Sequence, residues 1–158
     1  MRIGHGYDVH RFTDGDHIVL GGINIPYEKA FLAHSDGDVL IHAICDALLG
    51  AASMPDIGNL FPDNSDEFKN IDSKILLKKV CERLLEKSLE IEYIDCTIIA
   101  QAPKLAPHIQ NMRTGLAETM NISREMINVK ATTEEHLGFT GKKEGISAHS
   151  VCILKNKE

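Results

Sequence analysis

The sequence predicts an α+β fold, in which one mixed β-sheet is covered by helices on one face. Segments rich in β-branched residues alternate with segments of helical periodicity, and two strand-like segments lie close enough together to form a hairpin. The chain of 158 residues has the size of one domain, and it contains no repeat, low-complexity segment or long linker. We therefore expect a single domain over residues 1–158.

The first strand is predicted for residues 2–12, where apolar and polar positions alternate. The face opposite the apolar one carries Gly4, Gly6, Asp8 and His10. Because glycine has no side chain, we expect the two glycines to keep this face open. The strand would then display a carboxylate and an imidazole on an accessible surface.

The other elements are predicted from periodicity and capping signals. Further strands are predicted for residues 18–20, 23–26, 94–100, 127–131 and 146–154. Helices are predicted for residues 39–52, for residues 72–87 and for the segment after Pro107. The intervening stretch 54–70, rich in proline, glycine, aspartate and asparagine, is predicted to be a loop. Oligomerisation is one way to cover the sheet face that the helices leave free.

Composition restricts the classes of function. The formal net charge of −6 argues against a nucleic-acid-binding surface, which usually carries a basic face. No apolar run approaches the roughly 20 residues that span a bilayer, and the N-terminus lacks a signal-peptide pattern. The four cysteines are widely spaced and are expected to be reduced thiols. We expect a cytoplasmic protein with neither nucleic acid nor membrane as partner.

Asp8 and His10 are the first candidate metal ligands. Residues at i and i+2 on a strand point to the same face, and a carboxylate oxygen and an imidazole nitrogen both suit zinc. Taken alone, the pair equally fits an ordinary polar strand face. A second group of polar residues is needed to distinguish the two interpretations.

The predicted helix 39–52 supplies that second group. It is apolar on almost all sides, except for a stripe of Asp38, His42 and Asp46 spaced four residues apart. One interpretation makes His42 a core histidine bonded to a neighbour. The other makes it a third zinc ligand, with Asp46 or Asp38 orienting the imidazoles. Three protein ligands leave one tetrahedral position free, as in catalytic zinc sites.

Two further segments are candidate phosphate or nucleotide sites. Residues 132–135, with two threonines and two glutamates, follow a predicted strand, and Glu135 is suited to a hard cation such as Mg²⁺. A solvated acidic turn is the alternative. Residues 100–104 form a turn with free backbone groups and one lysine, which also fits a plain strand-to-helix connection.

Sequence motifs in eight places resemble those of the cyclodiphosphate synthases of the non-mevalonate isoprenoid pathway. They span nearly the whole chain in the family's order, at residues 4–10, 33–39, 46–52, 56–58, 60–63, 97–104, 129–133 and 137–141. The resemblance implies a homotrimer whose sheets pack around a central axis, with active sites at the subunit interfaces. It implies Zn²⁺ bound by Asp8, His10 and His42, and a second divalent cation (Mg²⁺ or Mn²⁺) placed by Glu135.

The same resemblance implies the substrate-binding residues. His34 and Thr133 would be catalytic, each donating a hydrogen bond to a phosphate. One subunit would contribute Asp8, His10, His34, Ser35, Asp56, Ile57, Gly58, Phe61, Pro62, Asp63, Asn64 and Ser65. A neighbouring subunit would contribute a cytidine pocket from Ala100, Gln101, Ala102, Pro103, Lys104, Leu105, Ala106, Ala131, Thr132 and Thr133. Further substrate contacts would come from Glu134, Glu135, Phe139 and Lys142.

The implied reaction converts 4-diphosphocytidyl-2-C-methyl-D-erythritol 2-phosphate into a cyclic diphosphate and CMP. A zinc-dependent phosphoester hydrolase is an alternative, and it would release a linear phosphate instead of a ring. A non-catalytic trimeric scaffold is another, and it would keep its function without Asp8 or His42. Product analysis and substitution of these ligands separate the three interpretations.

Overall fold

The computed structural model of the chain describes residues 1–62 and 71–157. Its main sheet contains, in spatial order, β4 (Lys29–Phe31), β1 (Arg2–Asp14), β7 (Gly145–Asn156), β5 (Leu89–Ile99) and β6 (Ile127–Thr132). Only β5 and β6 pair in parallel, whereas the other neighbours are antiparallel, so the sheet is mixed. A separate two-stranded sheet pairs β2 (His17–Leu20) with β3 (Ile23–Pro26), which confirms the predicted hairpin.

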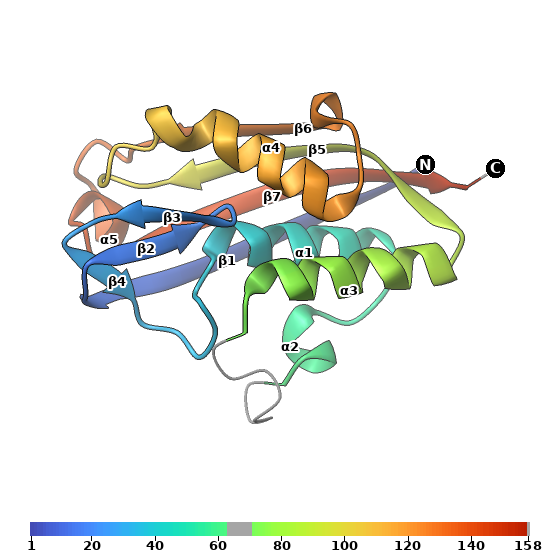
Figure 1. The fold of residues 1–158 in the computed structure, drawn as a ribbon, viewed down its shortest axis with the longest axis horizontal. Coiled ribbons are helices and arrows are strands. Elements are labelled where there is room, and N and C mark those ends of the chain that lie inside the picture. The colour runs from blue at the N-terminus through green and yellow to red at the C-terminus, as the bar shows by residue number, and fades with distance from the viewer. Residues whose placement is uncertain (63–70, 158) are drawn as a thin grey trace.

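Helices cover one face of the main sheet (Figure 1). The long helices α1 (Val39–Ala51), α3 (Ser73–Glu86) and α4 (Ile109–Met120) lie on this face, whereas the short α2 (Ile57–Leu60) packs beside α1 and the short α5 (Gly138–Gly141) beside β7. The core lies between the sheet and these helices, where Ile44 and Leu48 of α1 and Ile94 and Ile98 of β5 are fully buried. The predicted α+β fold with helices on one face is confirmed. No helix among the described residues is long and apolar enough to cross a membrane.

The two glycines of β1 have a different role from the one expected. A Cβ atom on Gly4 would lie 1.9 Å from the carbonyl oxygen of Ala47, and one on Gly6 would lie 1.9 Å from that of Ala43. Helix α1 therefore packs directly on the backbone of β1. The glycines do not keep this face open; they allow the closest possible approach of strand and helix.

No helix among residues 1–62 and 71–157 covers the opposite face of the sheet (Figure 1). Alternate residues of β1 on this face, Ile3, Tyr7 and Val9, are exposed, as are Tyr93 of β5 and Val151 of β7. These apolar side chains come from the three central strands and lie on one surface, because strand residues two apart point to the same side. Together with His5 and His149 between them, they form an exposed, partly apolar surface of the kind found at interfaces.

Several short elements were not predicted. Helix α2 lies within the stretch predicted to be a loop, and β4 and α5 have only three or four residues, too few to show a period. Strand β5 begins at Leu89 and not at residue 94; Leu89, Ile91 and Tyr93 alternate with two glutamates, which is a strand pattern that the prediction missed. A register irregularity between Ile91 and Tyr93 shifts the buried positions by one residue, so the alternation before it does not continue in phase into the predicted segment.

Candidate metal centre and substrate site

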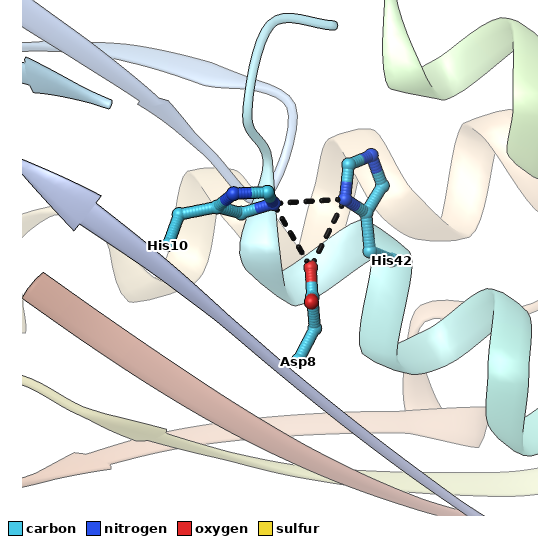
Figure 2. A group of neighbouring side chains, drawn as sticks. All are labelled: Asp8, His10 and His42. Atoms are coloured by element: carbon cyan, nitrogen blue, oxygen red, sulfur yellow. Dashed lines mark hydrogen bonds and ion pairs between the residues drawn. The ribbon is translucent and has the colours of Figure 1, made fainter. Parts of the chain in front are cut away.

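Asp8, His10 and His42 converge at one point, although 34 residues separate the outer two (Figure 2). Asp8 and His10 point from the same face of β1, and His42 comes from α1, which packs on that face. Helix α1 is fixed by Asp38, whose side chain accepts a hydrogen bond from the backbone N–H of Ile41 and caps the helix. The approach of α1 over the glycines thus brings the third ligand to the other two.

The three ligand atoms form a nearly equilateral triangle. Oδ2 of Asp8 lies 3.0 Å from Nε2 of His10 and 3.0 Å from Nδ1 of His42, and the two nitrogens are 3.2 Å apart. Bonds of 2.0–2.1 Å to a tetrahedral zinc ion place two ligand atoms about 3.3 Å apart. The observed separations therefore fit such an ion within a few tenths of an ångström. One carboxylate and two imidazoles are also a donor set that suits a divalent metal.

The charges at this centre support one another. Burial tends to raise the pKa of Asp8, but the hydrogen bonds and charges of His10 and His42 outweigh it and lower the pKa from 3.8 to about 2. Burial tends to lower the pKa of His42, but its hydrogen bond to Asp8 and the charge of that carboxylate raise it above 6.5. Asp8 is therefore an anion at neutral pH, as a metal ligand must be.

A cavity of about 270 Å³ opens onto the triangle. Besides the three ligands, it is lined by residues that the sequence predicted to bind substrate, namely His34, Ser35, Ile57, Gly58 and Phe61. Asp46, Ile71 and Leu76 complete its walls. The triangle is therefore not enclosed within the protein, because one side faces a space that can hold a small group.

The two aspartates of the polar stripe do not orient the imidazoles, so that prediction was wrong. Both carboxylate oxygens of Asp38 are occupied by backbone N–H groups of Gly21, Gly22 and Ile41. Asp46 accepts a hydrogen bond from the backbone N–H of Ile57 and so fixes the start of α2. Each aspartate therefore holds the backbone around the site. The spacing on α1 could not predict this role, because it does not show which neighbouring loop each carboxylate contacts.

Sequence reasoning did not connect Ser73 and Asp36 with the site. The Oγ atom of Ser73 lies 2.9 Å from Nε2 of His42, and it donates a hydrogen bond to Asp36. Ser73 is the first residue of α3 and lies 31 positions along the chain from the ligand that it contacts. The polar sequence around Asp36 gave no signal of this partnership.

The predicted cytidine-binding residues gather at a different cavity, of about 330 Å³. Its lining contains Ala100, Gln101, Pro103, Lys104, Leu105, Ala106, Ala131, Thr132 and Thr133, together with Ile109. Ala102 precedes Pro103 in a cis peptide bond within the same turn. No residue that lines this cavity also lines the cavity at the metal ligands.

The other predicted residues line neither cavity. Asp56 caps α2 by accepting a hydrogen bond from the N–H of Asn59, and its pKa is lowered by this bond. The backbone N–H of Glu135, a residue with φ of 53°, donates to Oγ1 of Thr133. The remaining side chains are placed as follows: Glu134 accepts a hydrogen bond from Thr140, and Pro62, Phe139 and Lys142 are exposed. Asp63, Asn64 and Ser65 lie outside the described residues.

Comparisons with known proteins identify the family. A model described as the YgbB family matches residues 1–155. The 2-C-methyl-D-erythritol 2,4-cyclodiphosphate synthase of Thioalkalivibrio sulfidiphilus is 58% identical over 156 residues, which cover 99% of this chain and 98% of that protein. The corresponding synthase of Azotobacter vinelandii is 57% identical over 154 residues, which cover 98% of each chain.

Solved structures agree with this assignment. The chain superposes on the bifunctional IspDF protein of Campylobacter jejuni with a TM-score of 0.95 and 43% identity, covering 99% of this chain but only 42% of that longer one. It superposes on IspF of Plasmodium falciparum, solved as a CDP complex, with a TM-score of 0.87 and 36% identity, covering 99% of this chain and 97% of the other. The chain belongs to the 2-C-methyl-D-erythritol 2,4-cyclodiphosphate synthase family.

Proposed function

We propose that this chain cyclises 4-diphosphocytidyl-2-C-methyl-D-erythritol 2-phosphate to 2-C-methyl-D-erythritol 2,4-cyclodiphosphate and releases CMP, in isoprenoid precursor biosynthesis. An oxygen of the 2-phosphate attacks the β-phosphorus, and the bond from that phosphorus to the oxygen bridging the α- and β-phosphates breaks. The observation that carries the proposal is the triangle of Asp8, His10 and His42, open to a cavity that His34 and Ser35 also line. The hydrolase alternative has no support among the relatives.

The donor set favours Zn²⁺ as the ion of the triangle. One carboxylate and two imidazoles leave a fourth tetrahedral position, and all three ligands line a cavity from which a substrate atom could reach it. Zinc bound there would supply Lewis acidity toward a β-phosphate oxygen. Glu135, exposed beside the cytidine cavity residue Thr133, would help to hold a Mg²⁺ or Mn²⁺ ion together with substrate phosphates.

The side chains around the cavity position the phosphates. The attacking 2-phosphate is already an anion at neutral pH, so the site requires no strong general base. It must bring two phosphates together against their repulsion and align them. His34 is exposed and Ser35 is half-buried at the cavity wall, where both can donate hydrogen bonds to phosphate oxygens. Thr133 would donate from the cytidine side.

A homotrimer would join the two cavities. The metal-ligand cavity and the cytidine cavity share no residue within one chain, yet one substrate must reach both. Packing of the uncovered apolar sheet face around a central axis would bury Ile3, Tyr7 and Val151. It would also place the metal ligands of one subunit beside the cytidine cavity of the next. We further propose a cytoplasmic enzyme with no nucleic-acid or membrane partner.

Phosphorus NMR of the product tests the proposed reaction. The zinc-loaded protein is incubated with the cytidine diphosphate substrate and Mg²⁺, with the Asp8→Ala variant as the matched control. We expect the ring diphosphate and CMP in equal amounts from the wild-type protein and neither from the variant. A linear phosphate product would show a hydrolase and overturn the proposal.

A further inference from the structure

His42 has two ring nitrogens with different environments. Its Nδ1 atom faces the ligand triangle, whereas Nε2 points away from Asp8 and His10 (Figure 2). The Nε2 atom lies 2.9 Å from Oγ of Ser73, the first residue of α3. Ser73 is completely buried, so no water competes for this contact. One buried hydroxyl thus fixes the side of the imidazole that the metal would not occupy.

Ser73 is itself held by Asp36 at two points. Its Oγ donates to Oδ1 of Asp36 at 2.5 Å, and its backbone N–H donates to Oδ2 of the same carboxylate at 2.9 Å. A serine hydroxyl has a single hydrogen to donate, and an ionised carboxylate has none and acts only as an acceptor. That hydrogen is therefore directed to Asp36, and toward His42 the hydroxyl oxygen acts as an acceptor.

The direction of these bonds determines which nitrogen of His42 can bind a metal. If Oγ of Ser73 accepts, Nε2 must carry the hydrogen, and a neutral imidazole then has its lone pair on Nδ1. Nδ1 is the atom 3.0 Å from Oδ2 of Asp8 and 3.2 Å from Nε2 of His10. The carboxylate, the hydroxyl and the imidazole form one directed chain that ends at the ligand triangle.

We propose that Ser73 and Asp36 are positioning residues, which set the orientation and the metal-binding nitrogen of His42. This inference rests on the proposed zinc site. Histidine ligands of metals usually donate their second N–H to such a partner, and loss of the partner typically lowers metal affinity about 10–100-fold. Here the partner is a hydroxyl from another helix, backed by a carboxylate from the loop that also carries His34 and Ser35.

A neighbouring serine provides a contrast. Oγ of Ser35 lies 3.4 Å from Nε2 of His42, at the limit of a hydrogen bond, and it accepts a hydrogen bond from the backbone N–H of Gly37 at 3.2 Å. Ser35 therefore supports the loop more than the imidazole. Among the described residues, Nδ1 of His10 has no hydrogen-bonded partner, so the directed chain belongs to His42 alone.

Zinc affinity of the full-length protein tests the proposal. Competition with a chromophoric chelator measures the zinc dissociation constant of the wild-type protein and of Ser73→Ala, Asp36→Asn, Ser35→Ala and Ser150→Ala. Ser150 is a buried serine on β7 that contacts Cys96, so its variant controls for the loss of any buried hydroxyl. We expect Ser73→Ala to weaken zinc binding about 10–100-fold and Asp36→Asn to weaken it in the same direction. The two control variants should change it less than about threefold.

A proton NMR measurement provides a readout independent of affinity. With ¹⁵N-labelled histidine and saturating zinc, the Nε2 proton of His42 should exchange slowly in the wild-type protein and rapidly in Ser73→Ala. Unchanged exchange, or equal affinity of Ser73→Ala and the wild type, overturns the positioning role. The Asp8→Ala variant separates failure of the positioning role from failure of the zinc site itself. If the wild-type protein binds zinc no better than Asp8→Ala, both the zinc site and the positioning role are refuted.

Discussion

Gly6 of β1 lies directly against Ala43 of α1, so closely that a Cβ atom on the glycine would be 1.9 Å from the alanine carbonyl oxygen. The atom in the way belongs to the backbone and cannot rotate aside. Asp8 and His10 lie two and four residues after this contact, and His42 immediately precedes Ala43. The same contact that packs the helix on the strand therefore sets the geometry of the metal ligands.

Gly6→Ala should damage both stability and the metal site. Overpacking of a core costs about 1–3 kcal/mol, and a backbone clash lies at the upper end of this range or above it. Gly115→Ala on α4 is the matched control, because a Cβ there meets nothing within 4 Å and alanine favours a helix by about 0.5–1 kcal/mol. Chemical denaturation and zinc stoichiometry measure the two effects. A Gly6→Ala protein as stable as the wild type would contradict the packing argument.

Chelation should remove activity and leave the fold. The core of the described chain is built from apolar residues of α1, α3, α4 and the sheet, and it does not depend on the ligand triangle. Removing zinc should therefore abolish turnover while the circular dichroism spectrum and the proposed trimer are retained, and added zinc should restore the rate. Unfolding to monomers on chelation would show a structural ion instead of a catalytic one.

The metal-free protein should lose stability in acid through Asp8. The pKa of Asp8 is lowered from 3.8 to about 2 in the folded chain, so the folded state binds fewer protons than the unfolded state in this range. The contribution of the Asp8 carboxylate to the free energy of unfolding is present above pH 3.8 and is lost as the pH falls toward 2. This pKa difference corresponds to about 2 kcal/mol. Asp8→Asn should lack this part of the acid dependence in urea titrations at pH 5 and pH 2.5.

His42 adds a dependence of the opposite sign. Its pKa is raised in the folded metal-free chain, so its contribution to stability is present below pH 6.5 and is lost as the pH rises through the raised pKa. The pair should therefore contribute most between about pH 4 and pH 6.5. A profile identical in the wild type and in Asp8→Asn would refute both assignments.

Sequence periodicity made the three residues of the triangle candidate ligands, but it revealed nothing of the residues around them. The alternation along β1 put Asp8 and His10 on one face, and the polar stripe of α1 singled out His42. Both patterns arise within one element, where geometry follows from spacing. Ser73 and Asp36 belong to different elements that meet only in the folded chain, so no local period could reveal them.

The glycines of β1 illustrate a second limit. A glycine on a polar strand face fits both an open surface and a tightly covered one. Only the position of Ala43 and Ala47 decides between them, and the sequence does not state which helix lies on which strand. Similarly, Asp38 and Asp46 share a stripe with His42, but their carboxylates accept hydrogen bonds from backbone N–H groups of neighbouring segments. The spacing along the stripe cannot predict which segments these are.

Subunit mixing tests whether each active site spans two chains. Asp8 and Thr133 line separate cavities. Asp8→Ala disables the metal-ligand cavity, and Thr133→Ala weakens the cytidine cavity. If the two cavities of one active site come from neighbouring subunits, refolding a 1:1 mixture into random trimers should leave both cavities unmutated in about a quarter of the active sites. The mixture should then be more active than the average of the two variants measured separately. A mixture with only the average activity of the two variants would show that each site lies within one chain.

Zinc-edge anomalous diffraction from crystals grown with cytidine diphosphate tests the central arrangement most directly. We expect one strong peak inside the triangle, with bonds of about 2.0–2.1 Å to Oδ2 of Asp8, Nε2 of His10 and Nδ1 of His42, and a phosphate oxygen in the fourth position. A zinc ion bound elsewhere, or one fully enclosed by four protein ligands, would contradict this account of the site.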